Sequence, residues 1–161
     1  MESIYQFTCN NSKGEAVALS QFKGKTVLFV NIASKCGFTP QLKGLEDLYK
    51  TYKEKGLEII AFPSNDFNQE PLNASSAASF CALNYGVSFH VMEKIRLKGP
   101  NAHPLYKFLG DKSKNGKTNI KPLWNFHKYV VDKNGFVKDY FMPFTNPTSA
   151  KVKAMIEACL R

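Results

Sequence analysis

The run from Thr26 to Ile32 is dominated by β-branched and large apolar side chains, and polar and apolar residues do not alternate along it. Such a run is typical of a strand that is buried on both faces at the centre of a sheet. Thr39 and Pro40 follow shortly afterwards, and a threonine before a proline favours the start of a helix, with the threonine as its cap. The chain is therefore expected to pass from a central strand through a short turn into a helix.

Cys36 lies in that turn. A cysteine between a strand and a helix is close to the positive end of the helix dipole and to backbone N–H groups without partners, and both favour the reactive thiolate. The neighbouring Lys35 adds a positive charge. The alternative is that Cys36 is a small hydrophobic residue of the core. We therefore treat Cys36 as the first candidate for a catalytic residue.

Length and composition predict one globular domain that spans residues 1–161, because 161 residues with 43% hydrophobic content can bury a core without disulfides. The net charge of +9 favours acidic partners. The lysines are scattered, however, and no nucleic-acid-binding motif accompanies them. We expect a solvated basic surface and no nucleic-acid partner.

The cysteines and histidines show no CxxC pair and no metal-ligand spacing; they are Cys9, Cys36, Cys81, Cys159, His90, His103 and His127. Neither a metal nor a bound cofactor is predicted from them. The N-terminus does not resemble a signal peptide, and no apolar run is long enough to span a membrane. We therefore expect a cytoplasmic protein with reduced thiols and no integral membrane association.

The rest of the chain alternates between strand and helix patterns. The expected elements are a hairpin of residues 4–7 and 16–19 with Cys9 at its turn, helices at 40–55, 73–85, 103–109 and 148–160, strands at 57–62 and 87–92, a mobile loop at 112–121, and a hairpin of 126–132 and 136–141. A β-α-β unit requires parallel strands with a right-handed crossover. This order predicts an α/β, thioredoxin-like fold with an N-terminal β-hairpin and a central mixed sheet flanked by helices.

The loop of residues 64–71 is polar and directly follows the second buried strand. Loops at the carboxyl ends of parallel strands line the crevice in which α/β proteins bind ligands. Asn65, Asp66 and Gln69 are therefore candidates for a binding or catalytic site. The alternative is that these side chains only stabilise turns.

Four segments resemble the glutathione peroxidase family: VNIASKCGFTPQ, FPSNDFNQEP, FCALNYGV and WNFHKYVVDKNG. They are most similar to its non-selenium, cysteine-type, monomeric members, which often use thioredoxin. The resemblance extends from about Tyr5 to the last helix. It implies a monomeric thiol peroxidase that reduces hydrogen peroxide and organic or lipid hydroperoxides.

The resemblance also implies roles for individual residues. Cys36 occupies the position of the peroxidatic residue, and Gln69, Trp124 and Asn125 complete the family's catalytic tetrad. A thiolate that attacks a peroxide must displace a poor leaving group, which amide and indole donors can stabilise. Cys36 then becomes a sulfenic acid. Cys81 stands at the position of a resolving cysteine, whose disulfide with Cys36 thioredoxin would reduce.

A disulfide requires Cα atoms within about 7 Å of each other. Cys81 lies in the interior of the expected helix 73–85, so we expect this helix to unwind locally on oxidation. Its alanines and serines are compatible with low local stability.

Three features depart from the family pattern. Ser64 replaces a frequent cysteine, and Asp66 replaces a glutamine and is expected to bring negative charge near the thiolate. The loop is also one residue shorter before Gln69, which leaves the direction of that side chain open.

Three alternatives to the thioredoxin-dependent enzyme stay open, and the altered loop favours only the third of them. One is a glutathione-dependent peroxidase, in which Cys81 is only a core residue. Another is a peroxide sensor or redox relay that oxidises a partner protein, and a third is a binding module with a degenerate site.

Overall fold

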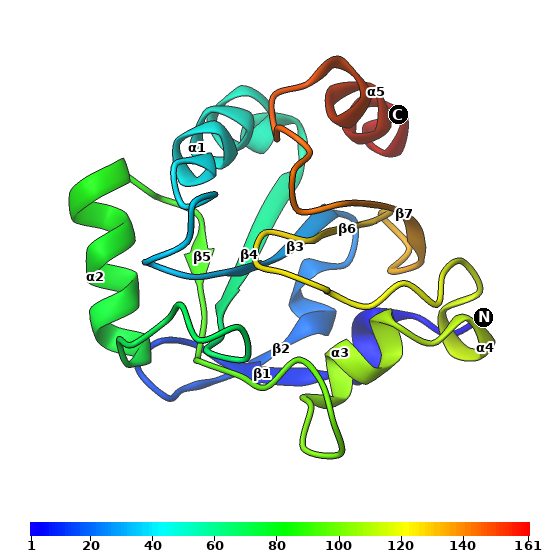
Figure 1. The fold of residues 1–161 in the computed structure, drawn as a ribbon. Coiled ribbons are helices and arrows are strands. Elements are labelled where there is room, and N and C mark those ends of the chain that lie inside the picture. The colour runs from blue at the N-terminus through cyan, green and yellow to red at the C-terminus, as the bar shows by residue number, and fades with distance from the viewer.

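The computed structural model describes residues 1–161 and contains a five-stranded sheet with helices on both faces (Figure 1). The strand order is β5-β4-β3-β6-β7. These strands are β3 (Thr26–Ile32), β4 (Leu57–Pro63), β5 (His90–Val91), β6 (Lys128–Val131) and β7 (Val137–Phe141). The central β3 is parallel to β4 and antiparallel to β6. The predicted mixed sheet is therefore confirmed.

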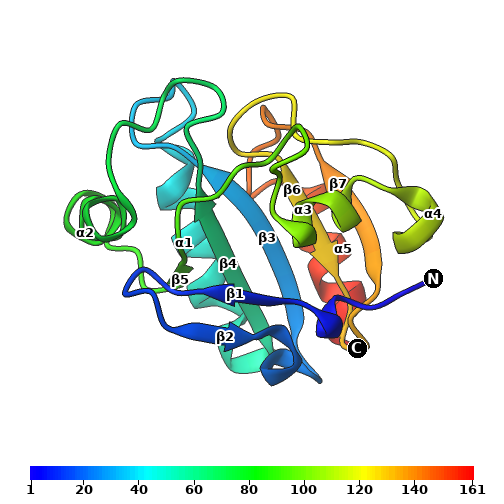
Figure 2. The ribbon, with the colours of Figure 1, turned by 90° about the horizontal axis from the view of Figure 1, so that it is seen from below.

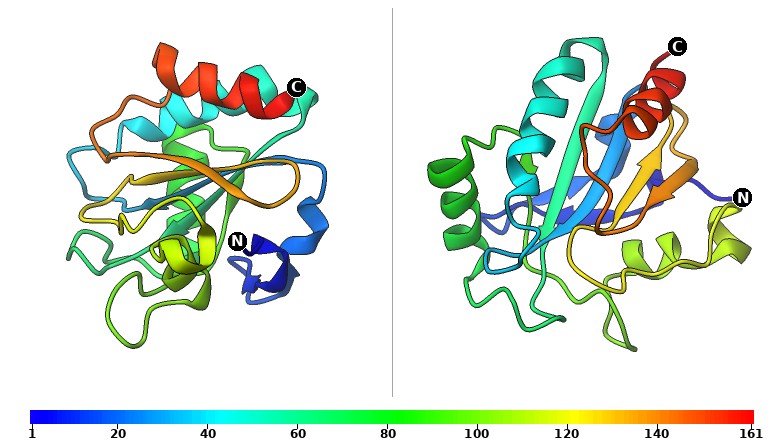
Figure 3. Two further views of the ribbon diagram at one scale, coloured as in Figure 1. Left: turned by 90° about the vertical axis from the view of Figure 1, so that its right-hand side faces the viewer. Right: turned by 45° about the horizontal axis from the view of Figure 1, so that its top comes forward.

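Strand β3 is buried along its whole length, because both faces of the sheet are covered. Leu28 and Val30 belong to a hydrophobic cluster shared with α1 (Gln41–Tyr52) and α5 (Ala150–Leu160), which lie side by side on one face (Figure 3). Val27 and Phe29 belong to a second cluster on the other face. Helix α3 (Pro104–Leu109) and the N-terminal segment cover that face (Figure 2).

The N-terminal hairpin exists, but its first strand was predicted in the wrong place. Strand β1 (Thr8–Asn10) pairs with β2 (Ala16–Ala18), whereas residues 4–6 form a 3₁₀ turn. That turn buries Ile4 completely, and the Ile4 N–H donates to the carbonyl oxygen of Gly135 at 2.9 Å. Cys9 is consequently a buried residue within β1 and does not lie at the hairpin turn. A contact with a distant turn overrides the local strand pattern here.

Helix α2 (Ala74–Tyr85) agrees with its predicted bounds. The Asn73 side chain accepts the Ser76 N–H at 2.9 Å, and Gly86 ends the helix in the left-handed conformation. None of the helices in the structure has the length and apolarity needed to cross a membrane.

The predicted loop at residues 112–121 is helical in its first part. The short helix α4 (Lys112–Asn115) lies in this segment. The buried Asn115 amide donates to the carbonyl oxygens of Phe108, Leu109 and Thr118 at 2.9–3.0 Å. This side chain anchors a segment whose lysines and glycine suggest an unanchored loop.

Candidate functional site

Cys36 lies in a tight turn beyond the carboxyl end of β3 and is 7% exposed. The Phe38 N–H donates to the Cys36 Sγ at 3.3 Å. The Cys36 N–H donates to the Thr39 Oγ1 at 2.9 Å, and that hydroxyl donates to the carbonyl oxygen of Ala33 at 2.8 Å. The turn therefore holds the sulfur next to a backbone donor.

Thr39 does not cap the following helix as predicted. Helix α1 begins at Gln41 with Pro40 as its cap, and no side chain caps it. The predicted cap was wrong because the Thr39 hydroxyl is already used within the Cys36 turn. A threonine next to a proline signals a helix start, but the sequence does not show which N–H group its hydroxyl will accept.

The loop of residues 64–70, which we call the Gln69 loop, is bound to the Cys36 turn. The Glu70 carboxylate accepts the Ser34 N–H at 2.9 Å and the Ser34 hydroxyl at 2.6 Å. The Lys35 N–H donates to the carbonyl oxygen of Gln69 at 3.0 Å. Glu70 was not among the predicted site residues, although it is next to Gln69 in the motif. It connects the segment that carries Cys36 to the segment that carries Gln69.

Residues 124–126 form the third segment, and Asn31 of β3 holds it in place. The Asn31 amide donates to the carbonyl oxygen of Trp124 at 3.1 Å, and the Phe126 N–H donates to the Asn31 carbonyl oxygen at 2.7 Å. Phe126 has a φ of +69°, which is uncommon for a residue with a side chain. Its strand therefore starts later than predicted, at Lys128.

Contacts join this segment to the other two. The rings of Trp124 and Phe67, a residue of the Gln69 loop, are 5.4 Å apart. Trp124 and Phe126 pack in the same hydrophobic cluster as Cys36. The Cys36 turn, the Gln69 loop and residues 124–126 thus converge at one end of the sheet.

Gln69 and Asn125 have buried side-chain atoms without hydrogen-bond partners at this end, and the side-chain oxygen of Asn31 is also unpaired. Asn125 is 0% exposed, and neither its amide nitrogen nor its oxygen is paired. The side-chain oxygen of Gln69 is also buried and unpaired. Each such group costs about 1–3 kcal/mol. Native proteins rarely keep them, and catalysis is one of the reasons that they do.

Cys81 is a free thiol on the inner side of α2 and is 2% exposed. It packs in the same hydrophobic cluster as Cys36, which is also free. Burial, with a smaller contribution from the negative charge of Glu70, raises the pKa of Cys81 to about 12. Cys81 is therefore protonated at neutral pH in this conformation and is not itself the attacking thiolate.

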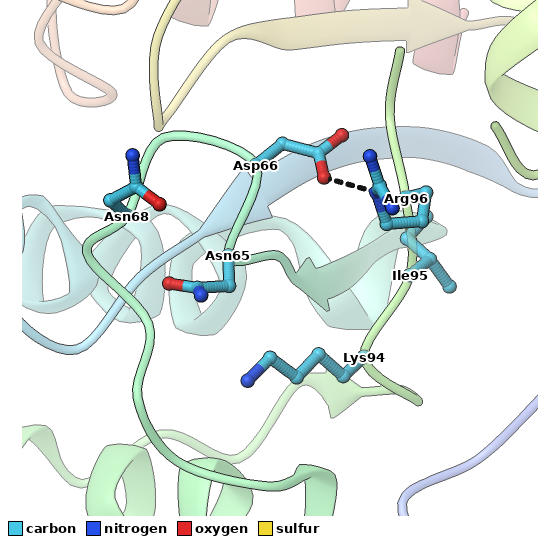
Figure 4. A pocket seen from close by; sticks show the side chains of 6 residues that line it. All are labelled: Asn65, Asp66, Asn68, Lys94, Ile95 and Arg96. Carbon is cyan, nitrogen blue, oxygen red and sulfur yellow. Dashed lines mark hydrogen bonds and ion pairs between the residues drawn. The ribbon is translucent and has the colours of Figure 1, made fainter. Parts of the chain in front are cut away.

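Asp66 is bound to donors on a neighbouring segment. Its carboxylate accepts the Arg96 Nε–H at 2.6 Å (Figure 4). It also accepts the backbone N–H groups of Leu97 and Lys98 at 2.7 and 3.1 Å. The expected negative charge is therefore countered by a cation and two N–H dipoles.

No three histidine, cysteine or acidic side chains lie together as a metal site. His127 stands alone in the core, where its ring is 4.7 Å from that of Tyr129 and 6.0 Å from that of Tyr140, and neither ring nitrogen has a partner. Burial, and then the positive charge of Lys128, lowers the pKa of His127 from 6.5 to about 4.

This buried ring predicts a loss of stability in acid. Between the two pKa values the unfolded chain binds the proton and the folded protein does not, so the free energy of unfolding falls as the pH drops from 6.5 towards 4. The expected loss is about 3 kcal/mol. His127→Phe should remove that part of the pH dependence, measured by urea unfolding at neutral pH and at about pH 4. Equal losses in the wild type and the variant would contradict this assignment.

Comparison with known proteins identifies the family of the chain and its fold. A model of the glutathione peroxidase family matches residues 4–110. The chain is 48% identical over 149 residues to glutathione peroxidase-like peroxiredoxin 2 of Saccharomyces cerevisiae, with 91% of each chain covered. A crystal structure of Trgpx in apo form superposes with a TM-score of 0.77 at 36% identity, covering 98% of this chain and 95% of that one.

A more distant likeness concerns the fold alone. A thioredoxin-family thiol:disulfide interchange protein from Chlorobium tepidum superposes with a TM-score of 0.68 at 15% identity, covering 96% of this chain and 93% of that one. The predicted thioredoxin-like fold is confirmed. With cysteine and no selenocysteine in its sequence, the chain belongs to the glutathione peroxidase family as a cysteine-type member.

Proposed function

We propose that this thiol peroxidase reduces hydrogen peroxide and organic hydroperoxides, including those of lipids, through Cys36. The thiolate sulfur attacks one peroxide oxygen, and the O–O bond breaks as the S–O bond forms. The second oxygen leaves as hydroxide or alkoxide and takes up a proton to become water or an alcohol. Cys36 is left as a sulfenic acid, so the sulfur is oxidised by two electrons and the peroxide is reduced by two.

The leaving oxygen needs hydrogen-bond donors, and we assign this role to Gln69, Trp124 and Asn125. Their amide and indole N–H groups carry no net charge, so they can orient a peroxide at any pH at which Cys36 is ionised. The observation that carries the proposal is the unpaired, buried amide of Asn125 in a segment that converges with the Cys36 turn. A donor fixed in advance stabilises developing charge without reorganising during the reaction.

Cys81 is proposed to resolve the sulfenic acid. Its sulfur attacks the Cys36 sulfur, the S–O bond breaks, and a disulfide and one water molecule form. Because Cys81 is buried and protonated inside α2, this step requires the helix to open. Ala77 and Cys81 are the only buried residues of α2, so few core contacts oppose opening.

Hydrogen exchange tests this opening. Amides of residues 74–85 should exchange faster in the oxidised protein than in the reduced one if the Cys36–Cys81 bond forms only when the helix opens. Amides of β3 serve as the internal control. Equal protection of α2 in both forms would contradict the opening.

The proposed reductant is thioredoxin, which would reduce the disulfide by thiol exchange and needs no bound cofactor. The name of the yeast relative, a glutathione peroxidase-like peroxiredoxin, agrees with a thiol-based cycle. We further propose that the enzyme works as a cytoplasmic monomer.

Steady-state kinetics distinguish the reductants. With hydrogen peroxide, turnover should be supported by thioredoxin and its reductase and not by glutathione. Turnover with glutathione alone would reassign the reductant. If neither thioredoxin nor glutathione supports turnover and a mixed disulfide forms with another protein, the result would favour the peroxide sensor.

A further inference from the structure

We propose that Asp66 is a positioning residue that fixes the Gln69 loop against residues 96–98 and thereby aligns Trp124 and Gln69. This proposal rests on the peroxidase function above. It concerns the position at which the sequence departs from the family's glutamine, where the charge is expected to disturb the site.

Asp66 is built into the structure as a buried clamp. Its side chain is 3% exposed, whereas that of Arg96 is 63% exposed. One carboxylate oxygen accepts the Arg96 Nε–H, and the other accepts the N–H groups of Leu97 and Lys98. Figure 4 shows the Asp66 side chain pointing toward Arg96 and away from Asn65 and Lys94. Three donors on one buried carboxylate fix its position more firmly than an exposed ion pair would.

Phe67, the residue after Asp66, connects Asp66 to the candidate active site. The Phe67 ring contacts both the Lys98 ammonium, 4.8 Å from its ring centre, and the Trp124 ring, whose centre is 5.4 Å away. Lys98 is also one of the residues whose N–H binds Asp66. Asp66 therefore binds the residue whose ammonium contacts the Phe67 ring and is itself the chain neighbour of Phe67.

Other contacts hold the far end of the same loop. The Lys94 ammonium donates to the carbonyl oxygens of Glu70 and Leu72 at 2.8 and 2.9 Å. Between the two anchors, Asn68 has a φ of +59°, which asparagine tolerates better than most residues. A short loop that is held at both ends has little conformational freedom. Loss of the contacts between Asp66 and residues 96–98 should therefore displace Phe67 and Gln69 together.

The primary test is Asp66→Asn, which keeps the size of the side chain. Its amide oxygen can still accept the two backbone N–H groups, but its amide nitrogen then faces the Arg96 Nε–H, donor against donor. We expect the rate constant for Cys36 oxidation by hydrogen peroxide to fall about 10- to 100-fold, because misplaced donors no longer meet the leaving oxygen. Alkylation of Cys36 by iodoacetamide, which does not use those donors, should change less than about twofold.

Tryptophan fluorescence reports whether the Gln69 loop still packs against Trp124. Trp124 is the only tryptophan in the chain, so intrinsic fluorescence from tryptophan reports its surroundings alone. In Asp66→Asn its emission should change, because Phe67 is released from the indole. This readout does not depend on turnover, so it separates failure of the clamp from failure of the proposed function.

Arg96→Gln supplies a rescue. A glutamine side chain places its amide group where the arginine Nε lies, and the amide can flip to present either a donor or an acceptor. The single variant should therefore stay close to wild type. Asp66→Asn combined with Arg96→Gln should recover most of the peroxide rate and the wild-type emission.

Asp47→Asn is the matched control, since Asp47 pairs with Lys43 on the exposed side of α1. It should leave both readouts unchanged. An unchanged peroxide rate and emission in Asp66→Asn would overturn the proposal. Equal losses of peroxide and iodoacetamide reactivity would also overturn it, because the variant would then have damaged the protein generally. Failure of the double variant to recover would exclude the Arg96 contact as the cause.

Discussion

Cys36→Ser is expected to reduce peroxide consumption to the uncatalysed rate, a loss of several orders of magnitude. A serine hydroxyl does not ionise at neutral pH, and oxygen cannot carry the two-electron oxidation that sulfur undergoes. The fold should survive, because serine is close to cysteine in size and can still accept the Phe38 N–H. The rate of peroxide loss under excess thiol reductant is the measurement.

Cys159→Ser provides the control for this substitution. Cys159 is partly exposed near the end of α5, and its carbonyl oxygen accepts the Thr26 hydroxyl at the start of β3, whereas Cys36 follows the other end of that strand. The Cys159→Ser variant should retain the wild-type rate of peroxide consumption. Substantial activity in Cys36→Ser, or loss of activity in Cys159→Ser, would show that another thiol performs the reaction.

Cys81→Ala is expected to abolish thioredoxin-dependent turnover while leaving the first oxidation of Cys36 at its wild-type rate. The resolving thiol takes no part in breaking the O–O bond, so a single turnover does not need it. Without it the sulfenic acid persists and is oxidised further to the sulfinic acid by excess peroxide. Alanine suits the helical, buried position, since it is apolar and the best helix former.

Two measurements check this variant: stopped-flow oxidation by peroxide, and steady-state turnover with thioredoxin. Undiminished turnover with thioredoxin would remove Cys81 from the cycle and leave it as a core residue. Turnover with glutathione that is equal in the variant and the wild type would instead support the glutathione-dependent alternative.

The elements that the sequence predicted well carry strong local signals. Strand β3 has its predicted bounds because a sheet covered on both faces needs a continuous apolar run. Helix α2 has its predicted bounds because Asn73 caps one end and Gly86 closes the other. The position of Cys36 between a strand and a helix follows from those neighbours.

The features that the sequence did not predict depend on distant partners. Phe126 is held by Asn31, and the buried Glu70 reaches Ser34. Asp66 is the clearest case, since its partner Arg96 lies 30 residues further along the chain. Its charge looks unfavourable beside a thiolate until that partner is known. The structure therefore gives the Asp66 charge a partner that the local sequence does not indicate.

The most direct test of the two-cysteine cycle is peptide mapping without reduction after one equivalent of hydrogen peroxide. The cycle predicts a single disulfide between the peptides that contain Cys36 and Cys81, with Cys9 and Cys159 still free. A sulfenic acid or an external thiol adduct on Cys36, with Cys81 unmodified, would contradict it.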